Sequence, residues 1–338
     1  MSITIQDIAK MANVSTTTVS RVINNKTEGV SEATREKILK IIHDTGYKPN
    51  SLARGLITKK TKTIGLIIPD ITNPFFPELA RGVEDMANKN GFNVFLCNTD
   101  DDPSKEKKYI DALKEKYVDG IIFTVSSNPN REHINELLKC GIPIVMMDRE
   151  LEDSDVKCVY IDNLEGGYIA TKYLINLGHK KIGCITGPLK SKSAIDRYKG
   201  YEKAMLESGI SINKDLVIES NYKIEGGILA TNKLLNNSDV SAIFACNDIM
   251  AYGAYKVIKQ RGYSVPQDIS IVGFDNIYIS NMMEKELTTI DQPTYSMGAT
   301  ATKMLIRSIN GERINKKHIC FKPKLIIRES ADKNFKNI

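Results

Sequence analysis

The stretch IQDIAKMANVSTTTVSRVIN, residues 5–24, determines the fold at the N-terminal end of the chain. From Ile5 its apolar side chains follow the i, i+3, i+4, i+7 spacing of a helix with one buried face. Asn13-Val14-Ser15 then interrupts the pattern, because Asn tolerates a left-handed turn and Ser15 can cap a following helix. A second amphipathic helix is expected from about Thr16 to Asn24. Two short helices joined by a tight turn predict a helix-turn-helix motif.

A third helix is expected to begin at Ser31 and to end at Gly46, which completes a three-helix domain over residues 1–47. The second helix of such a domain lies in the major groove of DNA, where short hydroxyl and Arg side chains can reach base edges. A purely structural three-helix bundle with a solvated polar face is the alternative. The candidate DNA-contacting residues of the second helix are Thr16, Thr17, Ser20 and Arg21.

The first 62 residues carry the whole charge excess of the chain. They contain eleven Lys and Arg against five Asp and Glu, whereas the complete chain of 338 residues contains 47 against 41. The other 276 residues therefore carry 36 charges of each sign. A lysine-rich solvated surface would spread its excess along the chain. Positive charge confined to one small segment instead indicates a nucleic-acid-binding domain attached to a neutral body.

Composition narrows the class of protein further. The contents of 41% hydrophobic and 26% charged residues are those of a soluble globular protein. No apolar run is long enough to span a membrane and the first residues lack the apolar region of a signal peptide, so we expect a cytoplasmic protein without a membrane partner. The six cysteines contain no CxxC pair and are expected to be buried free thiols. No metal or cofactor is predicted.

From Thr63 onward, short apolar strands alternate with amphipathic helices, which predicts an α/β fold with doubly wound parallel sheets. About 270 residues is large for one such unit, so two α/β subdomains are expected. The expected strands are 64–69, 93–98, 120–125, 143–148, 158–162, 181–186, 216–219, 242–245 and 270–274, with helices between them such as 76–90, 167–177, 195–208 and 249–261.

Polar and aromatic residues follow several of these strands, at the carboxyl ends where open α/β sheets bind ligands. Aromatic rings can stack on the apolar faces of a sugar, while planar Asp, Arg, Asn and Gln groups bond its hydroxyls. An Asp or Asn in such a place can also be a simple helix cap. The candidate ligand-binding residues are Asn73, Phe75, Phe76, Asp148, Arg149, Arg197, Asn247, Asp275 and Gln292.

The N-terminal sequence closely resembles the lactose-repressor/galactose-repressor (LacI/GalR) family of transcriptional regulators. The match covers residues 5–24 and continues through Gly46-Tyr47-Lys48-Pro49-Asn50 and Leu52-Ala53-Arg54. The resemblance implies a hinge helix from Pro49 to Leu56, inside a linker of residues 48–60. Ala53 and Leu56 would contact DNA there, with Leu56 as a minor-groove wedge. Eight residues are too few for a stable isolated helix, so we expect it to order only on DNA and in a dimer; a plain linker is the alternative.

The resemblance extends to the body and implies a core like that of periplasmic binding proteins, over residues 61–338. The chain would cross between subdomains near Asp162, Asp291 and Pro323. These crossings give an N-subdomain of residues 61–162 and 292–323, and a C-subdomain of residues 163–290 and 324–338. The candidate ligand-binding residues are similar to those of ribose-binding proteins and of Gram-positive ribose operon repressors. That likeness adds Tyr222, where Phe is common, as the ring opposite Phe75 and Phe76.

The expected function is that of a homodimeric repressor that binds a pseudopalindromic operator and responds to a small sugar, with D-ribose favoured. The tail after Ser330 has no leucine heptad, which favours a dimer over a tetramer. A sugar-processing enzyme is disfavoured, because none of the four His has a catalytic or metal-binding partner at a telling spacing. A periplasmic transport protein is disfavoured by the basic N-terminal domain. Within the family, a regulator that responds to another sugar or to a purine, or a catabolite-control regulator, is the alternative.

Overall fold

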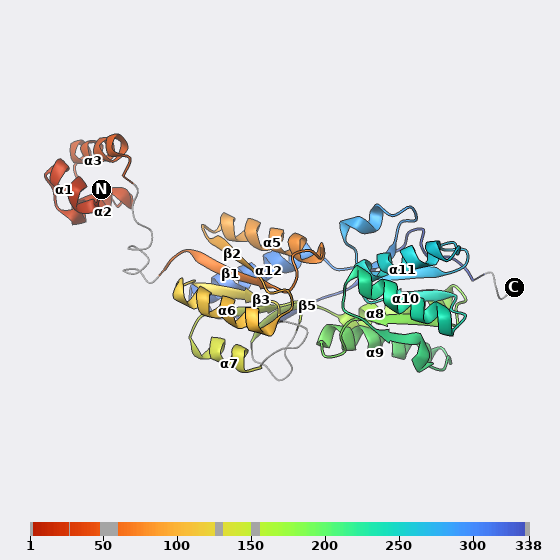
Figure 1. Ribbon diagram of the computed structural model, residues 1–338. Coiled ribbons are helices and arrows are strands. Elements are labelled where there is room, and N and C mark those ends of the chain that lie inside the picture. The colour runs from red at the N-terminus through yellow and green to blue at the C-terminus, as the bar shows by residue number, and fades with distance from the viewer. Residues whose placement is uncertain (1–2, 27, 48–59, 126–130, 150–155, 335–338) are drawn as a thin grey trace. The chain divides into compact units, whose positions relative to one another are not determined.

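The computed structural model describes residues 3–26, 28–47, 60–125, 131–149 and 156–334. The chain divides into two compact units, Met1–Thr61 and Lys62–Ile338. Figure 1 shows the small helical unit and the larger α/β unit. Within the described ranges, no helix is both long enough and apolar enough to span a bilayer.

The first unit is a three-helix domain built around α1 (Ile5–Ala12), α2 (Thr16–Ile23) and α3 (Glu32–Thr45). The Thr4 hydroxyl accepts a hydrogen bond from the Asp7 N–H, and the Asp7 carboxylate accepts one from the Thr4 N–H, so the two residues cap α1. Asn13 adopts the left-handed conformation that the turn requires, with φ of 55°. The predicted helix-turn-helix is confirmed. Its core is formed by Ile8, Ala9, Ala12, Val19, Val22 and Ile38.

The second unit contains two six-stranded sheets. Sheet A has the order β11-β5-β4-β3-β1-β2 and all its strand pairs are parallel. Sheet B has the order β12-β10-β9-β8-β6-β7 and is parallel except for β12. The strands are β1 (Thr63–Ile68), β2 (Asn93–Asn98), β3 (Gly120–Phe123), β4 (Ile144–Met147), β5 (Lys157–Ile161), β6 (Ile182–Thr186), β7 (Val217–Glu219), β8 (Ala242–Ala245), β9 (Ser270–Asp275), β10 (Thr288–Asp291), β11 (His318–Phe321) and β12 (Lys324–Ile326).

Helices cover both faces of each sheet, so the two predicted α/β subdomains are confirmed. In the N-subdomain, which is built on sheet A, α5 and α12 pack together on one face while α6 and α7 lie on the other (Figure 1). In the C-subdomain, built on sheet B, the pairs are α8 with α9 and α10 with α11. The helices are α5 (Phe75–Lys89), α6 (Pro103–Glu115), α7 (Arg131–Lys139), α12 (Thr294–Ile309), α8 (Asn163–Asn176), α9 (Lys192–Glu207), α10 (Ile224–Asn237) and α11 (Asp248–Gln260), with short 3-10 turns at Lys214–Leu216 and Tyr278–Asn281.

The chain passes between the subdomains three times: between β5 and α8, between β10 and α12, and between β11 and β12. The strands β10, β11 and β12 were not among the strands expected from sequence. β10 has four residues and is buried except at Asp291. β11 and β12 are edge strands of the two sheets. Each has at most four residues, and only partly buried or exposed side chains, so neither shows the continuous apolar run of the central strands.

Three pairs of helices cross at glycines, which lets their backbones approach closely. In the pair α8–α9, a Cβ atom at Gly167 would lie 2.1 Å from the carbonyl oxygen of Arg197, and one at Gly200 would lie 2.2 Å from that of Leu164. Only glycine fits at such contacts. The same arrangement recurs in the other two pairs, at Gly82 and Gly298 and at Gly227 and Gly253.

The cysteines differ in part from expectation. Cys97, Cys158, Cys184 and Cys246 are buried free thiols, as predicted. The prediction is wrong for Cys140 and Cys320, which are exposed. Cys140 directly follows α7, and Cys320 lies on β11, which forms an edge of sheet A and therefore has a partner strand on one side only.

Candidate functional site

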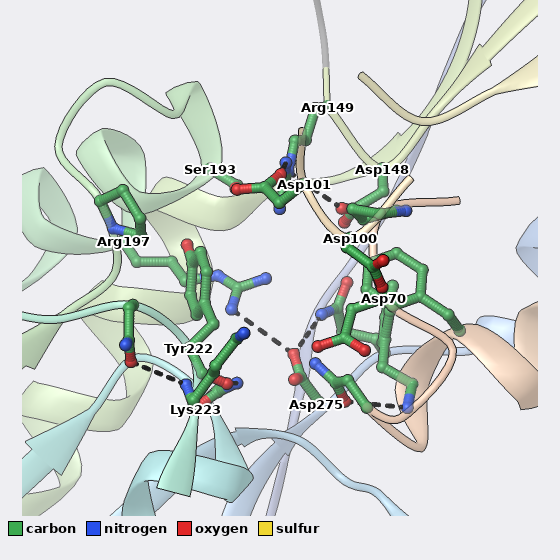
Figure 2. Close-up of a pocket in the computed structure, with 18 residues that line it drawn as sticks. Asp70, Asp100, Asp101, Asp148, Arg149, Ser193, Arg197, Tyr222, Lys223 and Asp275 are labelled. Carbon is green, nitrogen blue, oxygen red and sulfur yellow. Dashed lines mark hydrogen bonds and ion pairs between the residues drawn. The ribbon is translucent and has the colours of Figure 1, made fainter. Parts of the chain in front are cut away.

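A cavity of about 330 Å³ lies between the carboxyl ends of the two sheets, and residues of both subdomains line it (Figure 2). All ten residues that the sequence analysis proposed for ligand binding are among the eighteen that line it. The other eight are Pro69, Asp70, Asp100, Asp101, Pro188, Ser193, Asn221 and Lys223.

Asn73 and the two phenylalanines form one wall, at the start of α5. The Asn73 side-chain oxygen accepts a hydrogen bond of 3.1 Å from the Phe75 N–H, and its carbonyl accepts one of 3.1 Å from the Phe76 N–H. The two rings meet edge to face, 5.0 Å apart at 89°. Both are buried in the N-subdomain core. The two phenylalanines therefore belong to the core and to the cavity wall together.

The opposite wall contains Tyr222, whose ring lies directly over Gly187. A Cβ atom on Gly187 would be 2.1 Å from the Tyr222 ring, so only glycine lets the ring take this place. Tyr222 has a positive φ of 62°. Its backbone carbonyl accepts a hydrogen bond of 3.2 Å from the Asn247 side chain, whose own oxygen caps α11 through the Met250 N–H.

Backbone strain concentrates around the cavity. Positive φ is disfavoured for residues other than glycine, and such conformations gather at functional sites, where the surrounding structure imposes them. Five of the lining residues adopt it: Asp100 (53°), Asp101 (59°), Asp148 (68°), Tyr222 (62°) and Asp275 (114°).

Arg197 projects from α9 and is fixed on every side but the one facing the cavity. Its Nε donates a hydrogen bond of 2.8 Å to the Asn163 side chain, and its Nη1 donates one of 2.5 Å to the Cys246 carbonyl. Its guanidinium carbon lies 3.7 Å from the centroid of the Phe274 ring. No described residue accepts a hydrogen bond from its Nη2, which is therefore available to a ligand.

Asp275 completes this wall beside Arg197. Its Oδ1 accepts a hydrogen bond of 2.6 Å from the Gln292 amide and lies 3.4 Å from Arg197 Nη1. Burial raises the pKa of Asp275 to about 8 even though Arg197 opposes the shift. Burial therefore favours the protonated form of this carboxyl group. The Gln292 side-chain oxygen is buried without a hydrogen-bond partner among the described residues, which points to a donor supplied by a ligand.

Asp148 and Arg149 face this group from the N-subdomain, where β4 ends. Arg149 Nη1 donates to the Val125 carbonyl at 2.8 Å and to Asp101 at 3.3 Å. Burial raises the pKa of Asp148, while the charges of Arg149 and Arg197 oppose the shift. Arg149 is thus paired with Asp101 and Arg197 lies beside Asp275, while burial holds the carboxyl groups of Asp148 and Asp275 toward their neutral form. Such a site suits an uncharged ligand rich in hydroxyl groups.

Asp70, Asp100, Asp101 and Lys223 were not proposed from sequence, although they line the cavity. Asp100 and Asp101 follow β2 in the same way as Asp148 follows β4. The rule that ligands bind beyond the carboxyl ends of strands could therefore have found both. Lys223 precedes α10 and carries no such signal.

The proposed DNA-contacting residues lie on one helix of the first unit. Thr16, Thr17 and Arg21 are exposed on α2 and Ser20 is half-buried, so all four present polar atoms at its surface. The other two proposed DNA contacts, Ala53 and Leu56, lie outside the described residues.

The chain matches two family models. Residues 4–50 match the model of bacterial regulatory proteins of the lacI family, and residues 61–329 match that of periplasmic binding proteins and the sugar-binding domain of the LacI family. The chain belongs to the LacI family. Its members regulate transcription, and its second unit is the sugar-binding domain of that family.

Curated relatives in this family span several functions. The LacI-family chain is 42% identical to the transcriptional regulator DegA of Bacillus subtilis, over 98% of both chains. It is 40% identical to the HTH-type transcriptional repressor PurR of Histophilus somni, over 97% of this chain and 98% of the relative. It is also 40% identical to the ribose operon repressor of Halalkalibacterium halodurans, over 97% of both chains.

Solved structures of the family superimpose closely. A lac repressor dimer bound to operator and an anti-inducer covers 98% of this chain and 100% of its own, with a TM-score of 0.87 and 26% identity. A LacI-family regulator from Enterococcus faecium with bound ribose covers 80% of this chain and 98% of its own, with a TM-score of 0.73 and 33% identity.

Proposed function

We propose that this LacI-family protein is a homodimeric repressor whose affinity for its operator is controlled by D-ribose bound in the cavity. The observation that carries the proposal is the convergence of aromatic rings and neutralised polar groups on one cavity between two subdomains. The Enterococcus faecium regulator with bound ribose and the ribose operon repressor among the curated relatives support the choice of sugar.

In this proposal the sugar ring lies between the phenylalanines at the start of α5 and the Tyr222 ring. Asn73, Asp148, Arg149, Arg197, Asn247, Asp275 and Gln292 bond its hydroxyls. The Asp275 carboxyl, whose protonated form burial favours, and the unpaired Gln292 oxygen supply one donor and one acceptor to such a ligand. The protein binds the sugar reversibly and performs no chemistry on it, in keeping with relatives that are transcriptional regulators.

Residues 1–47 act as the DNA-binding domain in this proposal, with Thr16, Thr17, Ser20 and Arg21 reaching base edges. The hinge of residues 48–60 places Ala53 and Leu56 in the minor groove, and residues 61–338 bind the effector and dimerise. Ribose closes the cavity, changes the relation between the two N-subdomains of the dimer and frays the hinge. Sugar and operator then weaken each other's binding by the same factor, because their coupling is reciprocal.

Edge strand β2 supports a dimer through the N-subdomain. Phe95 and Leu96 are 47% and 44% exposed there, which is unusual for neighbouring large apolar side chains on an unpaired edge. Light scattering should give about twice the chain mass of 37.7 kDa. Phe95→Lys should shift this mass toward the monomer while the matched change at the exposed Leu206 should not. A monomeric wild-type protein would contradict the proposal.

An operator selected from random duplexes by the full-length protein tests the proposed function. Saturating ribose is expected to weaken operator binding at least about fivefold, since a coupling of about 1–3 kcal/mol corresponds to about 5–150-fold. Arg21→Ala should weaken operator binding and relax base choice at one position while ribose affinity stays unchanged. Other pentoses, hexoses and purines serve as comparison ligands in calorimetry. Tighter binding of one of these, with ribose inert, would reassign the effector to that compound.

A further inference from the structure

Lys and Arg side chains gather where the strands of sheet A begin, at the side of the sheet opposite the cavity. Because the strands of sheet A run parallel, their amino ends share one edge, and the helices between them end there as well. Each of the helices α5, α6, α7 and α12 carries a basic residue in its last turn, and the segments leading into the strands add others. The basic edge consists of Lys62, Lys89, Lys114, Lys116, Lys139, Lys157, Arg307, Arg313, Lys316 and Lys317.

Few described carboxylates offset these charges. Asp111 lies 3.6 Å from Lys114, and Glu312 lies 2.8 Å from Arg307. Lys89, Lys116, Lys139 and Lys316 are exposed, and none forms an ion pair with another described residue. The described part of this edge therefore keeps an excess of positive charge.

The C-subdomain provides a comparison within the same chain. A favourable interaction between basic side chains and helix C-termini would apply equally to both subdomains. Yet α8, α9 and α10 carry no basic residue in their last turns, and the Lys259 of α11 lies 3.4 Å from Glu284. Helix-end electrostatics alone therefore does not account for the basic edge of the N-subdomain.

The chain itself connects this edge to the DNA-binding unit. Lys62 immediately precedes β1, at the amino edge of sheet A, and residues 48–61 join it to the end of the three-helix domain. Fourteen residues can extend by about 3.5 Å each, so Lys62 stays within about 50 Å of that domain. A duplex held by the domain is thereby kept at a high effective concentration near the basic edge.

We propose that the basic edge is a second DNA-binding surface, which binds backbone phosphates of the duplex flanking the operator without reading its sequence. Duplex DNA presents a negative charge about every 1.7 Å along its axis, so a row of exposed lysines can bind it whatever the base sequence. This inference rests on the proposed function, because it requires an operator held by the three-helix domain.

Four lysines of the basic edge test the inference together. The variant Lys89→Gln, Lys116→Gln, Lys139→Gln, Lys316→Gln is compared with a control, Lys180→Gln, Lys214→Gln, Lys233→Gln, Lys256→Gln, which removes four exposed C-subdomain lysines without described ion pairs. Binding of full-length protein is measured on a duplex limited to the selected operator and on one extended by about two helical turns at each end.

Wild-type and control proteins should bind the extended duplex about tenfold more tightly than the short one, whereas the basic-edge variant should bind both alike. On the extended duplex, the slope of log K against log salt should become shallower by about 0.9 for each phosphate that the variant no longer neutralises. If the basic-edge variant binds the short duplex with the same affinity as the wild-type protein, the variant is folded. If the basic-edge variant kept the wild-type dependence of binding on duplex length and on salt, the inference would be overturned. A wild-type protein that selects no operator would instead contradict the proposed function.

Discussion

Replacing Arg197 with Ala is expected to weaken ribose binding at least about 25-fold. Arg197 is 4% exposed, and its contacts with Asn163, Cys246 and Phe274 hold the guanidinium plane in one orientation. A ligand that bonds Nη2 therefore meets a donor that needs no reorganisation. Removing one partner from a buried charged hydrogen bond costs about 2–5 kcal/mol, and each 1.4 kcal/mol is tenfold in affinity.

Calorimetry of wild-type protein, Arg197→Ala and Arg197→Lys checks this expectation. The Lys variant keeps the charge but loses the planar fork, so it should recover little of the affinity. Arg81→Ala is the matched control, because Arg81 is an exposed arginine of α5 paired with Asp85, and its loss should change ribose affinity less than about twofold. Binding of ribose by Arg197→Ala within tenfold of wild type would remove this residue from the site.

Removing Arg197 should also change the pKa of Asp275. The arginine is the largest influence that lowers the pKa of that carboxyl group, which burial raises to about 8. Without the cation the pKa of Asp275 should rise further, which favours the neutral carboxyl group over an unpaired charge in the core. The loss of affinity should therefore exceed the loss of folding stability.

Gly167→Ala is expected to lower both folding stability and ribose affinity. Its Cβ atom would meet the backbone carbonyl oxygen of Arg197 at 2.1 Å, so α8 and α9 must move apart. Such overpacking costs about 1–3 kcal/mol, and it displaces the backbone that carries the Arg197 side chain. Ribose affinity should fall at least tenfold, because an error of about 1 Å in the position of a binding group can cost about a hundredfold.

Thermal unfolding and calorimetry check this prediction, with Gly183→Ala as the control. The Cβ atom of that control would meet a methyl group of Leu234 at 2.9 Å, and a leucine side chain can rotate away where a backbone cannot. Gly183→Ala should therefore bind ribose like wild type. If Gly167→Ala left both the melting temperature and the affinity unchanged, the glycine crossing would have no part in positioning Arg197.

Local signals made the three-helix domain predictable. Caps at Thr4 and Ser15 and the left-handed turn at Asn13 act within a few residues, so their effect can be seen in a short stretch of sequence. The central strands were predictable for a similar reason, because strands buried on both faces are continuous apolar runs. Edge strands β11 and β12 lack such runs, and their partner strands lie far away in the chain.

The candidate ligand-binding residues could be proposed because parallel sheets bind ligands beyond the carboxyl ends of their strands. The sequence could not predict the pKa, the orientation or the hydrogen bonding of these side chains. The raised pKa of Asp275, the fixed orientation of Arg197 and the unpaired oxygen of Gln292 depend on burial among segments that meet only in the folded protein.

The distribution of charge likewise depends in one part on the sequence alone and in another part on the tertiary structure. By itself the sequence determined that residues 1–62 carry the net charge and that the other 276 residues are neutral. Only the tertiary structure decided how the charges of that neutral body are sorted. Parallel strands bring all their amino ends to one side of the sheet, so lysines scattered from Lys89 to Lys317 gather there. Carboxylates such as Asp70, Asp100 and Asp148 gather at the opposite edge, around the cavity, because each follows the carboxyl end of a strand.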